Sequence, residues 1–436
     1  MKLLLLFHTL RYLTPRQTVY RLLRSIQARL RPWFPTVPAM TQGHLAPPEL
    51  VLPEAWPRQS SLAEEGEGGV VITTPAETLS SPGPSRVSWD AAGRDALSRY
   101  LLAGQGYLLA SGTHPRLAGE LLLSAARDIL RPPSRRTAPL AATHPLSLRL
   151  IHWTRFVLSS RAPEFQVAQW AILRRAVAAQ LRRLLRRIEW ETEGNHLIDN
   201  ALGLLYGGAF LLGRAGSSGG AGGSVDAGAE LAQRAIARGW ELLRRESRKQ
   251  LLPDGAHEER STMYHLIVLE RLLDAEALLR NPGVLSALGR GGTGSEESEG
   301  VGADRIALRR RIAHALTWAR YLSWGDGSTP PLNDYFTDLT PRLREIEHYA
   351  EALGIQPLPA SPGRSGEARR GAPPASSTGG YLAVEAGPWE GLLDVGPIGP
   401  DHVPGHSHAD TLQLLLRFEG REFLVDGTEA VRQIRE

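Results

Sequence analysis

The chain has 436 residues, no cysteine and a formal net charge of +4. The lack of cysteine excludes disulfides, thiol nucleophiles and cysteine-ligated metals, and 42% hydrophobic with 22% charged residues suits a soluble protein with a sizeable core. At roughly 100–200 residues per domain, two or three domains fit. The small basic excess is compatible with an anionic polymer as ligand, and equally with an ordinary solvated surface.

The N-terminal region, residues 1–87, predicts a helix followed by a connector. Its first apolar run, Leu3 to Phe7, is shorter than the roughly 7–15 residues of a signal-peptide core, and no apolar stretch of about 18 or more residues predicts a transmembrane helix. From about Thr14 to Arg31 the pattern is that of a basic amphipathic helix, which can dock on the protein or make a peripheral contact with a membrane. Residues 35–87, rich in Pro, Gly, Ser and Glu, are interpreted as an extended, partly ordered connector.

Residues 88–358 predict an α-helical domain. Apolar residues recur at i, i+3 and i+4 in successive segments, several of which begin with proline or end before glycine or proline. The expected helices begin near Asp90, Pro115, Leu146, Pro163, Asn195, Ala229, Ser261, Asp304 and Pro341. Helix pairs joined by loops indicate an array of α-hairpins without the strict period of a short repeat.

Three low-complexity stretches are rich in Gly, Ser, Ala or Pro. This composition predicts flexible surface loops, because the entropy cost of closing a loop grows slowly with its length. They are Gly213–Gly228, Gly289–Gly302 and Pro359–Gly379. The last, residues 359–379, is expected to link two domains.

Residues 380–436 predict the start of an antiparallel β-domain. The apolar period changes to two after Gly380, and Phe418-Glu419-Gly420-Arg421 suits a hairpin turn. The expected strands are Tyr381–Glu385, Gly391–Val395, Leu412–Phe418 and Glu422–Val425. Four strands are fewer than the roughly seven of a complete sandwich.

Polar residues that could carry chemistry occur first in the helical domain. Asn195 heads a predicted helix and shares one face with Asp199; its amide can cap the helix or hold a substrate carboxylate. Residues 253–270 form a charged turn before a helix, with Ser261 or Thr262 as the expected N-cap, and they suit either a capping loop or a cleft. The turn-rich loop 325–338 offers the same two interpretations for Asn333 and Asp334.

A further polar stretch lies in the β-domain, at residues 400–418. His406 and His408 alternate in an extended segment, and residues i and i+2 of a strand face the same side. With Asp426 on the next expected strand, they would just reach the three protein ligands of a catalytic zinc site. A histidine-rich loop without metal is the alternative.

Taken together and in this order, these stretches resemble the heparinase II/III family of polysaccharide lyases. The segments are NHL…DN, DG-x-HEERS-x-MYH, DG…P-x-ND, PGHSHADTL and FLVDGT, and the N-terminal HTLRYLTPRQ is similar to bacterial members. The resemblance implies an α+β multidomain fold, with an incomplete (α/α) toroid followed by the start of an antiparallel β-sandwich. It also implies β-elimination on a uronic-acid-containing polysaccharide, either heparin or heparan-like or a bacterial surface glycan.

The resemblance assigns roles residue by residue. It makes Asn195 the group that neutralises the substrate carboxylate, Tyr264 the acid or both acid and base, and His406 the base or the partner of Tyr264. His408 and Asp426 match ligands of one structural zinc ion, and no organic cofactor is implied. The residues that would line the substrate cleft are His257, Glu259, Arg260, Asn333 and Asp334.

The sequence departs from the family near its C-terminus. Members continue with many more strands, whereas this chain ends eight residues after Thr428. We therefore expect a poorly stable or inactive β-part, because missing strands leave edges and apolar faces uncovered.

Location and function keep alternatives open. The family acts outside the cytoplasm, which implies the cell envelope or periplasm, although the N-terminus does not exclude the cytoplasm. The alternative function is a non-catalytic glycan-binding or envelope-polysaccharide assembly protein. A nucleic-acid binder is suggested only by a pI of about 9.5, without a basic stripe interleaved with aromatic residues.

Overall fold

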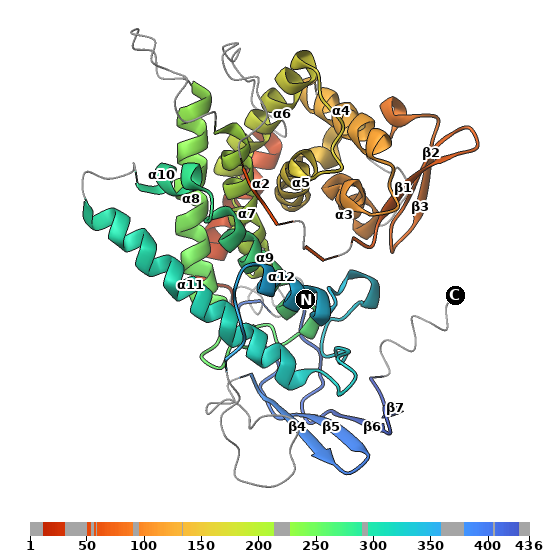
Figure 1. Ribbon diagram of the computed structural model, residues 1–436, viewed down its shortest axis with the longest axis vertical. Coiled ribbons are helices and arrows are strands. Elements are labelled where there is room, and N and C mark those ends of the chain that lie inside the picture. Colours follow the sequence, from red (N-terminus) through yellow and green to blue (C-terminus); the bar gives the residue numbers. More distant parts are fainter. Residues whose placement is uncertain are drawn as a thin grey trace.

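The computed structural model shows a large helical domain followed by a small antiparallel sheet (Figure 1). It describes residues 12–30, 50–53, 56–57, 59–89, 96–132, 134–212, 227–289, 295–358, 379–403 and 406–426. The loops expected at Gly213–Gly228 and Pro359–Gly379 lie almost entirely outside these residues, as do the helix start near Asp90 and the charged end of the chain. The fold class predicted from the sequence, α-helical domain first and antiparallel β-structure second, is confirmed.

Helices make up most of the described chain. The α-helices are α2 (Pro15–Leu30), α3 (Ala96–Gly104), α4 (Pro115–Leu130), α5 (Thr143–Leu158), α6 (Val167–Arg186), α7 (Asn195–Leu211), α8 (Ala227–Gln250), α9 (Thr262–Leu278), α10 (Pro282–Gly289), α11 (Ser295–Leu322) and α12 (Leu343–Ala352). Short 3-10 turns are η2 (Pro84–Arg86), η3 (Gly106–Leu109), η4 (Arg135–Ala141) and η5 (Thr337–Leu339). Among the described residues, no helix is long and apolar enough to cross a membrane.

Two sheets complete the structure. The first has the order β1-β2-β3, from β1 (Leu62–Gly66), β2 (Gly69–Thr73) and β3 (Thr78–Ser81). The second has the order β4-β5-β6-β7, from β4 (Tyr381–Ala386), β5 (Trp389–Asp394), β6 (Leu414–Phe418) and β7 (Arg421–Leu424). All neighbouring strands are antiparallel.

The structure corrects the sequence interpretation in three places. The expected connector contains the first sheet, whose strands are too short and too mixed in polarity to give a clear period of two. Ala63, Val70 and Ile72 nevertheless bury their side chains in the main core, so tertiary packing stabilises this sheet. Helix α10 was not expected. Helix α11 begins at Ser295, inside the stretch interpreted as a loop, so the low-complexity composition did not mark where this helix starts.

Helix α7 lies at the centre of the helical domain and packs against α5, α6, α8 and α9. Nearly all of its residues are buried, as expected for a helix that is apolar on every side. Close approach depends on glycine: a Cβ at Gly203 would lie 2.8 Å from the Cα of Ser147 on α5. The central position of α7 fixes its first residue, Asn195, relative to the rest of the domain.

The second sheet is attached to the helical domain by its own apolar cluster. Trp318 and Tyr321 of α11 pack with Tyr381, Leu392 and Leu415 of the sheet. The expected hairpin turn is confirmed between β6 and β7, where Glu419 (φ 50°) and Gly420 (φ 74°) both adopt the left-handed conformation of a type I′ turn. All four residues of β7 are exposed, so the edge of the sheet that β7 forms presents apolar side chains to solvent.

Candidate active site

The N-terminus of α7 forms one wall of the candidate site. Two left-handed residues lead into it, Glu193 (φ 61°) and Gly194 (φ 55°). A Cβ at Gly194 would lie 2.6 Å from a carboxylate oxygen of Glu259, so only glycine permits this approach. No side chain caps the helix, and the Asn195 side chain forms no hydrogen bond with the described residues. Gly194 is the N-cap residue and Asn195 is the first residue of the helix, so the capping alternative for Asn195 is wrong. Asn195 is itself 6% exposed, and its contact with a substrate carboxylate stays a prediction.

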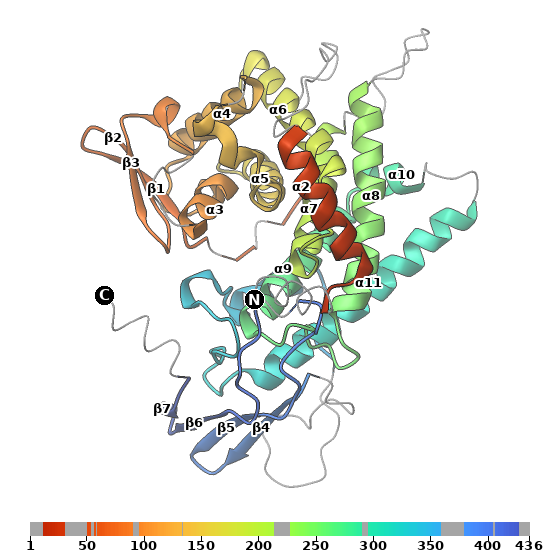
Figure 2. The ribbon, with the colours of Figure 1, turned by 180° about the vertical axis from the view of Figure 1, so that it is seen from behind.

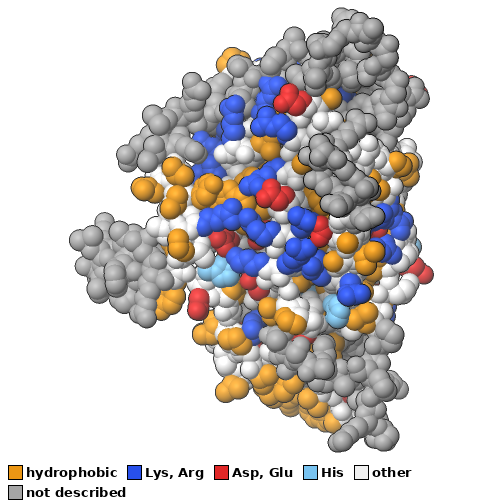
Figure 3. All heavy atoms as spheres, turned by 90° about the vertical axis from the view of Figure 1, so that its left-hand side faces the viewer, with side chains coloured by type: hydrophobic (Ala, Val, Ile, Leu, Met, Phe, Trp, Pro, Cys, Tyr) orange, Lys and Arg blue, Asp and Glu red, His pale blue; other side chains and the backbone are white. Residues whose placement is uncertain are grey.

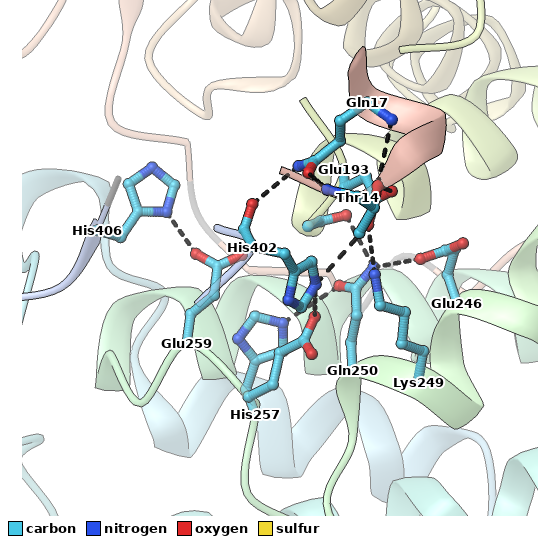
Figure 4. A network of polar contacts seen from close by, with 12 residues as sticks. Thr14, Gln17, Glu193, Glu246, Lys249, Gln250, His257, Glu259, His402 and His406 are labelled. Carbon is cyan, nitrogen blue, oxygen red and sulfur yellow. Dashed lines mark hydrogen bonds and ion pairs between the residues drawn. The ribbon is translucent and has the colours of Figure 1, made fainter. Parts of the chain in front are cut away.

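Glu259 and His406 form a pair at the centre of the site (Figure 4). Nδ1 of His406 donates a hydrogen bond to Oε2 of Glu259, whose side chain is only 1% exposed. Burial alone would raise the pKa of Glu259, but the bond to His406 and the nearby His257 hold it below its ordinary value. A carboxylate on Nδ1 orients the imidazole and leaves Nε2 as the nitrogen that can accept a proton.

Tyr264 stacks on His406. Their ring centroids are 4.0 Å apart and their planes differ by 15°. The Tyr264 hydroxyl donates to Oδ2 of Asp334 at 3.4 Å. Burial and the negative charges of Asp334 and Glu259 raise the pKa of Tyr264, so its hydroxyl is protonated at neutral pH. The site thus places a protonated phenol against an imidazole with one free nitrogen.

The start of α9 positions Tyr264. The expected N-cap is confirmed as Ser261, whose Oγ accepts a hydrogen bond from the Tyr264 backbone N–H at 3.2 Å. The same hydroxyl donates to the Asp334 carbonyl at 2.6 Å, and the Asp334 backbone N–H donates to the His406 carbonyl at 3.3 Å. Three segments far apart in the sequence are therefore connected by backbone contacts around Tyr264 and His406.

His196 lies beside Asn195 at the start of α7, and the sequence analysis assigned it no role. It follows Asn195, stacks on His144 with ring centroids 3.8 Å apart, and lies 3.5 Å from Glu189. Burial lowers the pKa of His196, but the nearby Glu189 carboxylate raises it, and the resulting pKa lies above the ordinary value of histidine. Asp199, on the same face, is held by His144 and Arg271, both at 2.7 Å, and serves the packing of α7. The signal for His196 was its place beside Asn195 in the NHL motif.

Three residues expected to line a substrate cleft lie behind the site instead. His257 and Asn333 are almost fully buried, and Arg260 is 8% exposed. Asn333 donates to the Tyr381 hydroxyl at 2.9 Å and accepts from the His408 backbone N–H at 2.9 Å, while the Arg260 carbonyl accepts from Tyr381 at 3.0 Å. These residues brace the sheet against the start of α9. Glu259 is buried as well. Among the five residues expected to line the cleft, Asp334 alone is partly exposed.

The expected zinc ligands face another part of the sheet. His406 and His408 do not point the same way, because this segment is not a regular strand: His406 binds Glu259, whereas His408 lines a cavity of about 640 Å³ with Asp410 and Asp426. Within the described residues, no three His, Asp or Glu side chains converge closely enough to hold a metal ion. Donor groups suited to zinc are present, but they do not form a three-ligand set. The zinc ion therefore stays a prediction.

A basic groove lies on α8 next to the site. It has a volume of about 400 Å³ and is lined by Glu241, Arg244, Arg245, Arg248 and Lys249. Arg244 and Arg248 share one carboxylate, that of Asp304. Lys and Arg side chains gather across the middle of the face shown in Figure 3, which is the side where α8 and α11 lie in Figure 1. This face suits a negatively charged ligand.

Comparison with known proteins bears on the fold of the chain. Residues 368–427 match the family described as heparinase II/III-like, C-terminal. The fold is similar to the crystal structure of heparinase III, with a TM-score of 0.50 and 16% identity over 81% of this chain and 54% of that chain. The chain has a heparinase III fold. Heparan sulfate lyase HepC from Pedobacter heparinus is also similar, with a TM-score of 0.43 and 16% identity over 82% of this chain and 55% of that one.

The chain spans about half the length of these solved structures. No curated protein matches it. The family match covers β4 to β7 and all three histidines of the 400–418 stretch, so it includes the segment that contributes His406 to the site.

Proposed function

We propose that this heparinase-like chain is a polysaccharide lyase that cleaves a uronic-acid-containing acidic polysaccharide by β-elimination. The observation that carries the proposal is the stacked pair of Tyr264 and His406, with His406 oriented by buried Glu259 beside the N-terminus of α7. Elimination at a uronate needs a base, an acid and a group that neutralises the carboxylate, and the site offers one of each.

The first step removes the proton at C5. Nε2 of His406 takes this proton, and Glu259 stabilises the imidazolium that results. The electron pair moves toward the uronate carboxylate, where the Asn195 amide and His196 would offset the growing negative charge. The raised pKa of His196 supports a cationic role there.

The second step breaks the bond between C4 and the glycosidic oxygen. The electron pair left at C5 forms the C4–C5 double bond, and the departing oxygen takes the proton of the Tyr264 hydroxyl. The raised pKa of Tyr264 favours this acid role over that of a base, because the phenol holds its proton until the leaving oxygen becomes basic. Proton transfer from the His406 imidazolium to the Tyr264 phenolate, whose rings are stacked, returns both side chains to their starting protonation states.

The substrate class is part of the proposal. Heparin, heparan-like chains and bacterial surface glycans all present carboxylates or sulfates at regular spacing, and the basic groove on α8 would bind such a chain beyond the reacting sugar. We place the protein in the cell envelope or periplasm, where such glycans are found. Membrane-protein fractionation of the native host would check this location.

The test is release of unsaturated uronate, followed by ultraviolet absorbance over a panel of heparin, heparan sulfate, hyaluronan, alginate and bacterial capsule. We expect one polymer to give product, and Tyr264→Phe to lower kcat by about 10²–10⁴-fold with an unchanged melting temperature. Polymer binding without product from the folded wild-type chain would favour the glycan-binding alternative. Wild-type turnover by Tyr264→Phe would remove Tyr264 from the mechanism.

A further inference from the structure

Helix α2 is docked on the helical domain although more than 150 residues separate it from its contacts. Figure 2 shows it crossing over α7 and α8. Arg24 donates to Oε1 of Glu191 at 2.6 Å and to the Ile188 carbonyl at 2.7 Å. Trp190 receives the Arg16 guanidinium at 3.5 Å from its ring centroid. These contacts bind α2 to the segment that leads into α7, which confirms the docking interpretation of this helix.

The first turn of α2 is a reciprocal capping box. The Thr14 backbone N–H donates to Oε1 of Gln17 at 2.8 Å, and the Gln17 backbone N–H donates to Oγ1 of Thr14 at 3.2 Å. The Thr14 and Gln17 side chains therefore each use one acceptor oxygen to cap the helix. The hydroxyl of Thr14 and the amide N–H₂ of Gln17 remain as donors that point away from the helix.

These two donors reach the two loops that carry the site. Oγ1 of Thr14 donates to Oε1 of Glu193 at 3.1 Å, and Nε2 of Gln17 donates to the His402 carbonyl at 2.8 Å (Figure 4). Glu193 lies two residues before Asn195, and His402 lies four residues before His406. The capping box therefore spans the helical domain and the β-segment at the point where each presents a site residue.

The neighbouring contacts make this junction buried and specific. Gln17 is 1% exposed, and Nε2 of His402 lies 3.7 Å from Oε2 of Glu193. Lys249 also pairs with Glu193, and Nε2 of Gln250 donates to the Gly194 carbonyl at 2.8 Å. Glu193 and Gly194 are held from α8 on one side and from α2 on the other.

We propose that the first turn of α2 is a positioning element for the reaction, in which Thr14 and Gln17 hold the loops of Asn195 and His406 at their working separation. This inference rests on the proposed lyase function. Asn195 and His406 come from different domains, and a misplacement of about 1 Å between reacting groups can cost about 10²-fold in rate. Thr14 and Gln17 act through these loops and do not contact the substrate.

The decisive variant is Gln17→Glu. Glutamate completes a capping box as well as glutamine does, so α2 keeps its cap, but the donor to the His402 carbonyl is lost. We expect kcat to fall by about 10–100-fold, KM to change less than about threefold, and hydrogen exchange to rise in the peptides that contain His402 and His406. Gln17→Ala should give the same pattern with a loss of helix stability in addition.

Two further variants serve as controls. Leu22→Ala lies on the exposed face of α2 and should leave kcat and exchange unchanged. Thr14→Ser keeps the hydroxyl and should behave as wild type, whereas Thr14→Val should raise exchange around Glu193 and Asn195. If Gln17→Glu failed to fold, Thr14→Val would be compared with Gln17→Ala, because both variants weaken the cap but each removes a different donor to the site loops. Exchange that rises around Glu193 in the first and around His402 in the second would support the positioning role, and equal exchange in both would overturn it.

Wild-type kcat and wild-type exchange in both Gln17→Glu and Thr14→Val would overturn the positioning role. The exchange measurement needs no substrate, so it tests the junction even if no polymer is cleaved. If the lyase proposal is wrong, the wild-type chain shows no turnover, but the exchange differences between wild type and variants remain. If only the positioning proposal is wrong, the wild-type chain and the variants turn over substrate equally.

Discussion

At the scale of single residues, Glu259 decides which nitrogen of His406 can act. Its ionised carboxylate holds Nδ1 and, in the reaction that we propose, stabilises the positive charge that appears when Nε2 takes a proton. Glu259→Gln keeps the size but removes the charge, and the new amide can donate to Nδ1 and turn the ring into the other tautomer.

We expect Glu259→Gln to lower kcat by about 10²–10⁴-fold with little change in KM. The measurement is the pH dependence of kcat on the best polymer. Glu258→Gln, the same chemical change one residue away, is the control and should keep kcat within about threefold of wild type. A wild-type rate in Glu259→Gln would contradict the assigned role of His406 as the base.

Glu258 makes the stability of the fold depend on pH. Burial raises the pKa of Glu258 to about 7, and Lys249 only partly offsets the neighbouring carboxylates Glu259, Glu246 and Glu193. The folded state therefore holds this proton more tightly than the unfolded state, whose ordinary value is 4.5. Its contribution to stability is fully present below pH 4.5 and is lost as the pH rises toward 7.

Glu258→Gln should remove this dependence. At pH 8 we expect the variant to be more stable than wild type by about 1–3 kcal/mol, and at pH 4.5 the two should be nearly equal. Thermal melting at the two pH values measures the difference. A constant difference in melting temperature across this range would show that Glu258 does not titrate between the states.

The residue scale also shows the limit of motif recognition. The order of motifs pointed to Asn195, Tyr264 and His406, and the structure stacks Tyr264 on His406 and places Glu259 between His406 and the residue before Asn195. The same motifs placed His257, Arg260 and Asn333 in the cleft, where the structure buries them. A sequence pattern gives the residues of a polar turn, but which of them faces solvent depends on the segments packed over the turn, here the second sheet.

At the scale of elements, the second apolar cluster decides whether His406 meets Tyr264. Leu392 is 1% exposed and packs between the sheet and α11, whereas Val384 on the neighbouring strand is 56% exposed. The sheet is small, so the attachment to α11 supplies much of its stability.

Leu392→Ala should destabilise the sheet by about 2–5 kcal/mol and lower kcat, because the loop of His406 would lose its support. Val384→Ala, on the exposed side, should change stability by less than about 0.5 kcal/mol. Hydrogen exchange of β4 to β6 together with kcat tests both. Equal effects of the two variants would mean that the cluster does not hold the sheet in place.

Elements differ in how well the sequence predicts them. Long periodic helices and the strands β4 to β7 were expected close to their observed positions, because their periods of 3.6 and two are local properties. The sheet β1 to β3 was missed, since strands of four or five residues with glutamate and glycine carry little periodicity. Its stability comes from the helical core beneath it.

At the scale of the whole molecule, the basic groove on α8 offers a second place, beyond the reacting residues, where an acidic polymer could contact the protein. Arg244 and Arg248 share the carboxylate of Asp304, while Arg245 pairs with Glu246 and Lys249 with Glu193. A polyanion bound to this groove should be sensitive to salt, because screening weakens exposed charge pairs.

We expect Arg244→Ala and Arg248→Ala each to weaken heparin binding about threefold, in line with ~0.6 kcal/mol for an exposed charge pair, and to reduce the salt dependence. Arg116→Ala on α4, where Arg116 pairs with Glu120, removes the same charge elsewhere and is the control. Salt concentration at elution from a heparin column is the measurement. Equal shifts in all three variants would indicate a general charge effect and no groove.

Local patterns in the sequence were enough to predict the helical domain, the β-strands that follow it, and the residues that we propose as acid, base and carboxylate-binding group. These follow from local periodicity and from motif order, which are properties of short segments. The contact of Glu259 with His406, the place of His408 in a separate cavity, and the contacts of α2 with the two loops of the site could be seen only in the folded chain. Those contacts link residues as far apart as 385 positions, and no local pattern records which distant surfaces meet when apolar area is buried.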